Sequence, residues 1–376
     1  MKWSNKAAKV CATIKLRRDE GVHLGNIGTA HRNLGQVVES LAYYQQALAI
    51  SREVGNASDE SAWLGHLGNA YTILGQLNQA IDSYQQAQAI SRKLSDRQNE
   101  AAYLGGLGSA YFAQGRVKEA MTYYQQALDI NLELGDRQNL SNALGNLGIC
   151  HRALGQIETA LKYHQQALTI SQEVGDRRSE SNDWGNLGTT YRLQKEIEKA
   201  IECYEKALTI CRDIGYRQGE ADHLGKLGLA YCDLGQIDKV IDCYEQALII
   251  SQEIGHRRSE ATHFGNLGNI YQSLKELDKA FDYHQQALAI SREIGDRQNE
   301  GIDLGNLGNV YYAHGQFEQA VEYYEQALAI SREVGNRPFE GNQLHNLWWS
   351  HHKLNQKEQA KQYLSQWLMI EKENRR

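Results

Sequence analysis

Asparagine side chains recur at two fixed positions of a 40-residue repeat, where their chemistry would be hydrogen bonding to another chain. When each repeat is numbered from 1, beginning at Gly21, position 6 is asparagine in six of nine repeats. A carboxamide offers two donors and an acceptor, so a row of them can pair with a peptide backbone whatever its side chains. The alternative is that these amides bond neighbouring helices or water. The candidates are Asn26, Asn146, Asn186, Asn266, Asn306 and Asn346 at position 6, and Asn69, Asn269 and Asn309 at position 9.

Charged residues on the same predicted face have the opposite sign from the whole chain. The formal net charge is -6, yet five basic residues on this face stand against two acidic ones. This excess favours an acidic peptide or a C-terminal carboxylate as ligand, because arginine pairs well with carboxylates; ordinary solvated charge is the alternative. The residues are Arg32, Arg152, Arg192, Lys226 and Lys353 against Asp222 and Asp233, with Ile73, Phe112 and Tyr312 as apolar residues that could seat ligand side chains.

Residues that could perform catalysis do not assemble into a known pattern. No P-loop, GxSxG, HExxH or EF-hand sequence occurs, and the GNLG runs fall inside a predicted helix rather than in a phosphate-binding loop. His345 and His352 share a helical face, but two histidines are too few for a metal site. Cys203 and Cys243, one period apart, are predicted to be packing residues rather than a redox pair. We therefore predict no enzymatic activity, no metal and no cofactor.

The elements that would position these residues are paired helices. Repeats begin every 40 residues from Gly21 to Gly341 without insertion or deletion. Positions 4, 7, 8 and 11 fall on one face at 3.6-residue spacing, and positions 17, 20, 21, 24, 27, 28, 31 and 34 form a second, longer stripe. Gly315 separates two such helices, and the Gly-Asp-Arg run at 295–297 supplies a left-handed residue and a helix N-cap. Stacking of neighbouring repeats would bury both apolar faces.

Both ends depart from the repeat. Residues 1–20 match the second half of the pattern through Ala7 and Val10, which predicts a partial repeat with a second helix only. The apolar face of this helix would be left partly uncovered. We therefore expect that another segment precedes it, that the helix acts as a makeshift N-terminal cap, or that another chain docks there. Residues 21–340 hold eight full repeats, and residues 341–376 a divergent ninth. There Trp348, Trp367 and Lys361 replace small or apolar residues, which predicts a C-terminal capping repeat.

Composition narrows the class of protein further. A pI near 6.1 provides no net positive field for nucleic acid or anionic membranes. No apolar run approaches the roughly 20 residues needed to span a bilayer. The single proline, Pro338, fits nearly continuous helix, and six scattered cysteines suit a reducing compartment. We therefore expect a cytoplasmic protein that binds neither nucleic acid nor membrane.

The repeat resembles the tetratricopeptide repeat. The residues that carry the resemblance are Leu304, Leu307, Gly308, Tyr311, Ala320, Tyr324 and Ala327. The 40-residue step and the Leu-Gly-Asn-Leu-Gly-Asn run at 304–309 are similar to the LGN/Pins adaptors, more loosely to kinesin light chains, and in texture to long bacterial arrays. The resemblance implies an all-α fold, a right-handed superhelix of about nine helix–turn–helix repeats. It also implies a concave groove, lined by the first helices, that takes up a peptide.

Two glycines inside the first helix need a physical reason, since each costs about 1 kcal/mol relative to alanine. Position 8, as in Gly308, lies on the buried face, which predicts close packing against the alanines at positions 20 and 27. Position 5, as in Gly305, faces the other way. Close approach of a bound ligand backbone and a packing habit of the family are the two interpretations there.

These observations together predict a non-catalytic adaptor that binds a partner peptide or protein in its groove. A self-assembling array that docks through its N-terminal end is one alternative, and a sensor segment of a larger signalling protein is another. Reading of RNA is disfavoured because the chain is acidic overall. The sequence does not identify the partner, the register of the peptide, the oligomeric state or the pathway.

Overall fold

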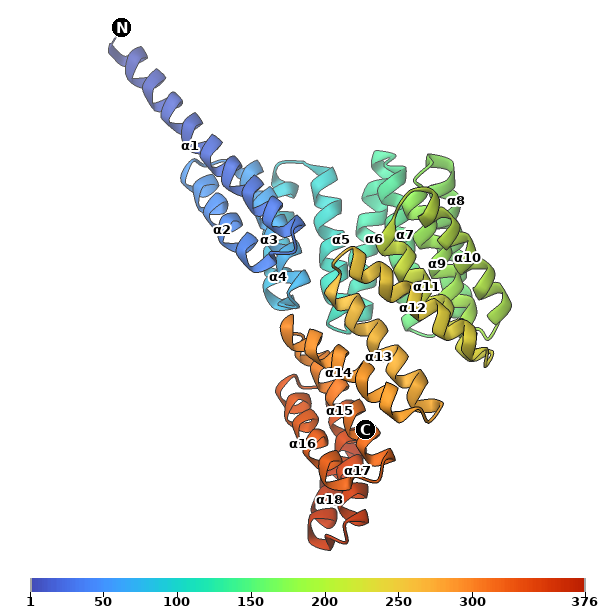
Figure 1. Cartoon of the computed structure of the whole chain (residues 1–376). Helices are drawn as coiled ribbons and strands as arrows, with labels where there is room; N and C mark the ends of the chain where they lie inside the picture. Colours follow the sequence, from blue (N-terminus) through green and yellow to red (C-terminus); the bar gives the residue numbers. More distant parts are fainter. Residues whose placement is uncertain (1, 375–376) are drawn as a thin grey trace. The chain divides into compact units, whose positions relative to one another are not determined.

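The computed structural model describes residues 2–374, with side chains from 13 to 372, and within that range it contains helices and turns but no strand (Figure 1). The chain divides into two compact units that meet between Gln194 and Lys195. The first unit contains α1 (Lys2–Asn33), α2 (Val37–Glu53), α3 (Ala57–Ile73), α4 (Leu77–Lys93), α5 (Arg97–Ala113), α6 (Val117–Leu134), α7 (Arg137–Ala153), α8 (Ile157–Val174) and α9 (Arg177–Leu193). The second contains α10 (Ile197–Asp213), α11 (Arg217–Asp233), α12 (Ile237–Glu253), α13 (Arg257–Ser273), α14 (Leu277–Glu293), α15 (Arg297–Ala313), α16 (Phe317–Glu333), α17 (Arg337–Lys353) and α18 (Lys357–Asn374). The predicted all-α solenoid of about nine helix–turn–helix repeats is confirmed.

Short turns separate the helices where the predicted punctuation lies. Gly295 and Gly315 take positive φ angles of 68° and 77°, a conformation that costs glycine little. Asp296 then accepts a hydrogen bond from the backbone N–H of Asn299 at 3.2 Å and caps α15. Pro338 lies in the first turn of α17, where its missing N–H is tolerated. Four non-glycine residues also take positive φ at equivalent turns: Ser95, Lys195, Lys275 and Asn355.

The first helix differs from the expectation for residues 1–20. α1 runs unbroken from Lys2 to Asn33, so residues 2–20 are its N-terminal part and not a separate helix (Figure 1). The cause is visible in the sequence, because Lys15 and Leu16 stand where other repeats have the turn glycine and the capping residue. The side chains of Ala7 and Val10, which carried the prediction of a partial repeat, lie outside the described residues.

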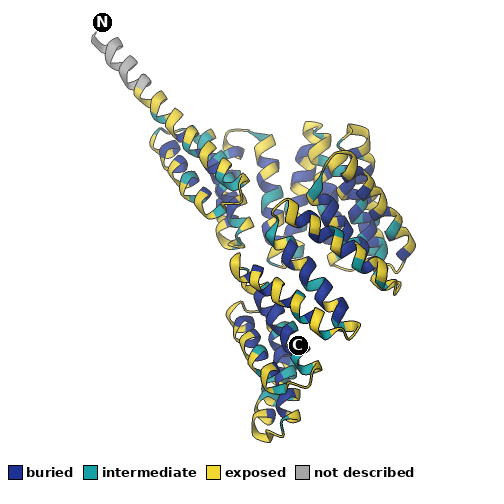
Figure 2. Ribbon diagram, viewed as in Figure 1, coloured by how far each residue is buried: buried dark blue, intermediate teal, exposed yellow. Residues whose placement is uncertain are grey.

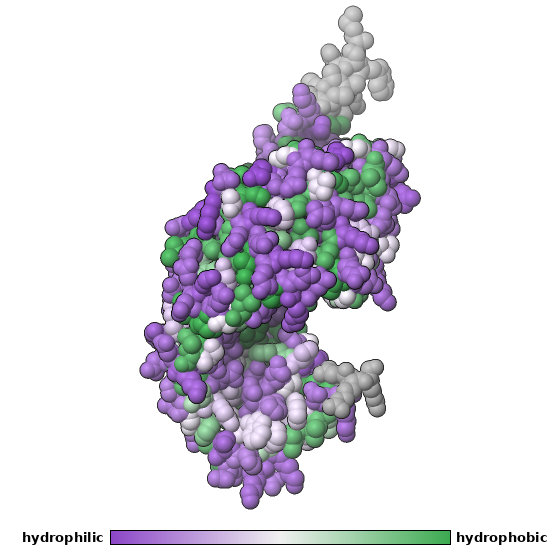
Figure 3. Space-filling view, turned by 90° about the vertical axis from the view of Figure 1, so that its right-hand side faces the viewer, coloured by the Kyte–Doolittle hydropathy of each residue, from purple (hydrophilic) through white to green (hydrophobic). Residues whose placement is uncertain are grey.

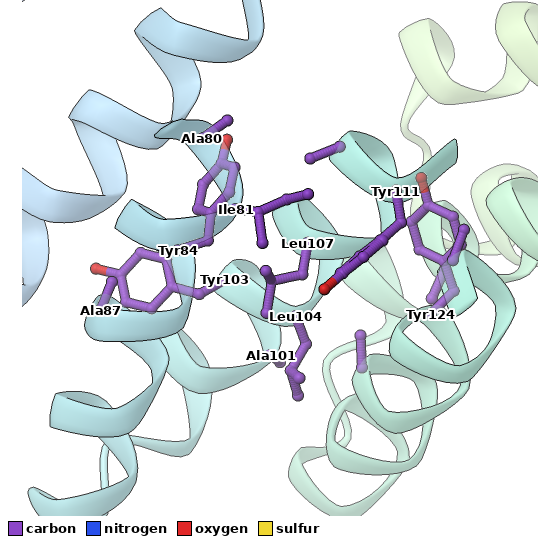
Figure 4. Close-up of a cluster of buried hydrophobic side chains, with 14 of the residues drawn as sticks. Ala80, Ile81, Tyr84, Ala87, Ala101, Tyr103, Leu104, Leu107, Tyr111 and Tyr124 are labelled. Atoms are coloured by element: carbon purple, nitrogen blue, oxygen red, sulfur yellow. The ribbon is translucent and has the colours of Figure 1, made fainter. Parts of the chain in front are cut away.

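Along most helices, buried residues alternate with exposed ones, so that each helix has a buried and an exposed side (Figure 2). Leu304, Leu307, Ala320, Tyr324 and Ala327 are all buried, as the two predicted stripes require. Figure 4 shows the same pattern in the first unit, where side chains from neighbouring helices meet in one cluster. The labelled members are Ala80, Ile81, Tyr84, Ala87, Ala101, Tyr103, Leu104, Leu107, Tyr111 and Tyr124.

The glycine at position 8 makes room for an aromatic ring. A Cβ atom added to Gly308 would lie 2.6 Å from Cδ1 of Tyr324, and one added to Gly68 would lie 2.7 Å from Cε1 of Tyr84. The ring belongs to position 24 of the same repeat. The predicted close approach is therefore confirmed, but the alanines at positions 20 and 27 are the wrong partners.

The glycine at position 5 faces the next repeat. A Cβ atom on Gly65 would lie 2.3 Å from Cε1 of Tyr103, which is position 3 of the following repeat. Trp63 fills the same space at Gly25. Gly105 has nothing within 4 Å, because its neighbour at position 3 is only Ala143. The packing interpretation of position 5 is confirmed wherever the next repeat supplies a large side chain.

An ion-pair network that sequence reasoning missed links adjacent repeats. Glu220, at position 40, is only 5% exposed and accepts bonds from Arg212 at 2.8 Å and Arg217 at 2.6 Å. Arg217 also pairs with Glu253 of the next repeat. The recurring arginine three residues before a glutamate was the available signal. Because the carboxylate is buried, the two arginines supply the compensation that burial demands.

Candidate peptide-binding face

We call the surface formed by positions 6, 9, 12 and 13 of the first helices the groove face. In the second unit a hollow of about 470 Å³ opens on it. The hollow brings together four residues that the sequence placed on this face: Asn309, Tyr312, Asn346 and Lys353. Its complete lining is Gln272 from α13, Asn309, Tyr312 and Ala313 from α15, Tyr324 from α16, and Asn346, Trp349 and Lys353 from α17.

Asparagines at position 9 serve the fold with their oxygen atoms. Tyr324 Oη donates to Asn309 Oδ1 at 2.8 Å, and Asn346 Nδ2 lies 3.4 Å from the same oxygen. Tyr84 Oη likewise donates to Asn69 Oδ1 at 2.7 Å. Asn269 is exposed, and the residue at its position 24 is histidine rather than tyrosine. The alternative of bonding between neighbouring helices therefore holds for the oxygens of Asn69 and Asn309.

Apart from Asn346, the asparagines at position 6 form no such hydrogen bond. Asn26 is exposed, and Asn146, Asn186, Asn266 and Asn306 are half-buried. Within residues 13–372 no side-chain hydrogen bond holds any of these five carboxamides. Each is therefore placed to donate and accept at the surface of its helix.

The basic residues of this face lie in both units. Arg32, on α1, is half-buried. Burial of the His66 imidazole lowers the pKa of that group, and the positive charge of Arg32 lowers it further. Burial raises the pKa of Asp222, and the positive charge of Lys226, on α11, acts in the opposite direction. Lys353 is exposed and forms no ion pair with any described residue. The other predicted residues are Arg152 and Arg192, half-buried; Asp233 and Ile73, exposed; and Phe112, half-buried.

Trp349 is the residue of this face that sequence reasoning missed. Its Nε1–H donates to His345 Nε2 at 3.2 Å, and its ring centroid lies 4.8 Å from that of Trp348. Trp348 stacks in turn on Trp367 at 6.0 Å, so the two tryptophans that replace small residues fill the last repeat together. An aromatic residue at position 9 was the available signal.

Figure 3 shows one face of the molecule, on which polar side chains predominate and apolar patches lie between them.

Two buried aspartates lie at position 3, on the junction with the preceding repeat. Ser171 Oγ donates to Asp183 Oδ2 at 2.8 Å, and Ser291 Oγ donates to Asp303 Oδ2 at the same distance. Burial raises the pKa of each carboxyl group to about 7, against the serine hydrogen bonds that lower it. Neighbouring carboxylates such as Glu300 raise the pKa further. Each group therefore retains its proton to a higher pH than an exposed aspartate does.

The two cysteines that lie one period apart are packing residues. Cys203 and Cys243 are buried and unpaired, and burial raises the pKa of both thiols to about 11. Among the described residues no cluster of three or more histidine, cysteine, aspartate or glutamate side chains could hold a metal ion. No helix in that range is long and apolar enough to cross a membrane.

Comparison with known proteins places the repeats in a family. The tetratricopeptide repeat description matches overlapping windows at 19–93, 59–133, 98–173, 139–213, 176–253, 218–293, 258–333 and 300–368. No curated protein matches the chain significantly. The windows together cover nearly all of it.

Solved structures share the fold at low identity. A signal transduction ATPase with a tetratricopeptide repeat sensor from Pyrococcus horikoshii is 16% identical with a TM-score of 0.63, covering 92% of this chain and 52% of that one. A Rap protein complexed with competence and sporulation factor is 16% identical with a TM-score of 0.60, covering 95% and 98%. The Rap conjugation gene regulator of plasmid pLS20, in complex with the Phr* peptide, is 19% identical with a TM-score of 0.56, covering 72% and 73%. With its repeats matched from residue 19 to residue 368, the chain belongs to the tetratricopeptide repeat family.

Proposed function

We propose that this chain is a non-catalytic adaptor of the cytoplasm that binds a partner peptide or protein along its groove face. The observation that carries the proposal is the set of position-6 carboxamides. Asn26 is exposed, Asn146, Asn186, Asn266 and Asn306 are half-buried, and none is held by a side-chain hydrogen bond within residues 13–372. A fold that needed them would bond them to neighbours, as it does at position 9.

The character of the face supports an acidic partner. The face carries five basic residues: Arg32, Arg152, Arg192, Lys226 and Lys353. The charge of Lys226 already favours the ionised form of a carboxylate on the chain itself, that of Asp222. Complementary charge favours encounter with an acidic segment and disfavours a basic one. Two Rap proteins of similar fold form complexes with competence and sporulation factor and with the Phr* peptide, which is consistent with this use of the face.

The test compares three baits in a pull-down from cell extract followed by mass spectrometry. The first is the native chain, and the second carries Asn146, Asn186, Asn266 and Asn306 changed to alanine. The third is a matched control in which four exposed carboxamides of the second helices, Gln46, Gln126, Gln166 and Gln286, become alanine. We expect a partner that the native chain and the control retain and the asparagine variant loses. A partner retained by all three would place binding elsewhere.

A second candidate function is self-assembly through the N-terminal end. Apolar side chains at that end are exposed, among them Leu16 at 71% and Val38 at 65%. Exposed apolar surface of this kind favours association with another copy. Sedimentation velocity over a range of concentrations tests this, with Leu16→Glu as the variant that should dissociate an assembly. A constant monomer in the native chain would exclude it.

A further inference from the structure

The hollow on α15 and α17 differs from the rest of the groove face because an aromatic ring stands at position 9, where the other repeats have a polar or aliphatic side chain. Trp349 is the one aromatic residue at position 9 in the sequence. Its indole N–H is already bonded to His345, and Trp348 and His352 contact the ring at centroid distances of 4.8 Å and 5.8 Å. The ring is therefore held in one orientation and is 39% exposed.

A second aromatic side chain lines the same hollow. Tyr312, from α15, is half-buried and meets Phe317 edge-on at 5.2 Å, so this ring is also supported. A volume of about 470 Å³ lies within the range of natural ligand pockets. Aromatic rings pair favourably with one another in stacked or edge-to-face arrangements. The space suits one large aromatic side chain of a ligand together with its adjoining backbone.

Polar groups at the rim add a charge preference. Lys353 lines the hollow without an ion-pair partner among the described residues, and no carboxylate is part of the lining. Gln272 and Asn346 contribute carboxamides, which can bond a peptide backbone. An unpaired ammonium group beside an aromatic wall favours an acidic residue next to the aromatic one.

We propose that this hollow is an anchor subsite that takes one aromatic side chain of a bound peptide, with an acidic neighbour at Lys353. The anchor would fix the register of the peptide, since the repeated asparagines alone would permit shifts by whole repeats. This inference rests on the proposed function, because it names the ligand chemistry of the same face.

The test uses synthetic probes and fluorescence anisotropy. The main probe is a fluorescein-labelled serine-glycine peptide with one central Glu-Trp-Glu and an amidated C-terminus. Matched probes replace tryptophan by alanine or both glutamates by lysines. We expect the main probe to bind about 10-fold more tightly than either, a difference typical of one buried anchor. Trp349→Asn, which installs the residue found at Asn309, should abolish the advantage of tryptophan, while Trp349→Phe should retain it.

Two controls separate failure of the anchor from failure of the groove. Circular dichroism checks that each variant is folded. Probes that bind equally well with and without tryptophan, yet bind less well to Asn306→Ala, would overturn the anchor and leave the groove in place. Absence of any probe binding would also overturn the anchor, and the asparagine pull-down would then decide the groove separately. A further probe lacks both glutamates and ends in a tryptophan with a free C-terminal carboxylate. If this probe binds as tightly as the main probe, the assignment of an acidic neighbour at Lys353 is overturned.

Discussion

Replacing Asp303 by asparagine should make the chain more stable at alkaline pH and leave it unchanged in acid. The folded chain holds this buried carboxyl group with a pKa of about 7, against an ordinary value of 3.8. Between these two values the unfolded chain has released a proton that the folded chain retains. Raising the pH through that window therefore destabilises the fold, and the loss is complete above about pH 7. An amide does not titrate, and its oxygen can still accept the bond from Ser291.

The size of the effect follows from the two pKa values. A difference of about 3 pKa units corresponds to about 4 kcal/mol at about 1.36 kcal/mol per unit. The difference in unfolding free energy between Asp303→Asn and the native chain should thus grow from about zero near pH 4 to about 4 kcal/mol near pH 8. Asp183→Asn should show the same trend, because burial also raises the pKa of its carboxyl group to about 7, with Ser171 and Ser141 both donating to it.

Urea titrations followed by circular dichroism at the two pH values measure this difference. Other titrating groups are common to both chains and cancel. Asp282→Asn, which removes an exposed carboxylate from α14, is the matched control and should show no growth of the difference with pH. Parallel loss of stability in the native chain and Asp303→Asn would refute the reasoning, since it would mean that the buried group is ionised throughout.

Four other substitutions test the glycines, one turn and one buried ion pair by the same titration at neutral pH. Gly105→Ala should stabilise by about 1 kcal/mol, because its Cβ position is empty. Gly65→Ala should destabilise by about 1–3 kcal/mol, because the new atom meets the Tyr103 ring; equal effects would contradict the junction described above. Ser95→Gly should stabilise by about 1 kcal/mol by relieving a positive φ, and no change would contradict strain there. Glu220→Gln should cost about 1–3 kcal/mol, and a neutral result would mean that its two arginines contribute nothing.

Periodicity was sufficient to predict the helices, their turns and their buried faces. It works because the helices after α1 have 17 or 18 residues and the turns between them carry local signals, such as the glycine at 295 and the cap at Asp296. The sequence also contains the reason why α1 is unbroken, since Lys15 and Leu16 replace the turn glycine and the capping residue. The prediction of a separate second helix followed the match at the other repeat positions and not the missing turn glycine and capping residue.

Contacts between repeats could not be read from one helix. The partner of Gly65 is Tyr103, which lies in the next repeat, and a helical wheel shows only which way a residue faces. The same limit applies to Asn309, whose oxygen is bonded by Tyr324 from the other helix of its repeat. Trp349 is a different case, because it departs from the recurrence and periodicity singles out only residues that recur.

The pairing of each position-5 glycine with a position-3 side chain has a consequence for how such a gene changes length. Slippage or unequal crossing-over between near-identical repeats removes or adds units of 40 codons. Each event brings a new side chain against an old glycine, and Trp63 or Tyr103 would again face a position that lacks a Cβ atom. The junction therefore tolerates recombination, so the number of repeats can drift over generations while every boundary between them stays packable.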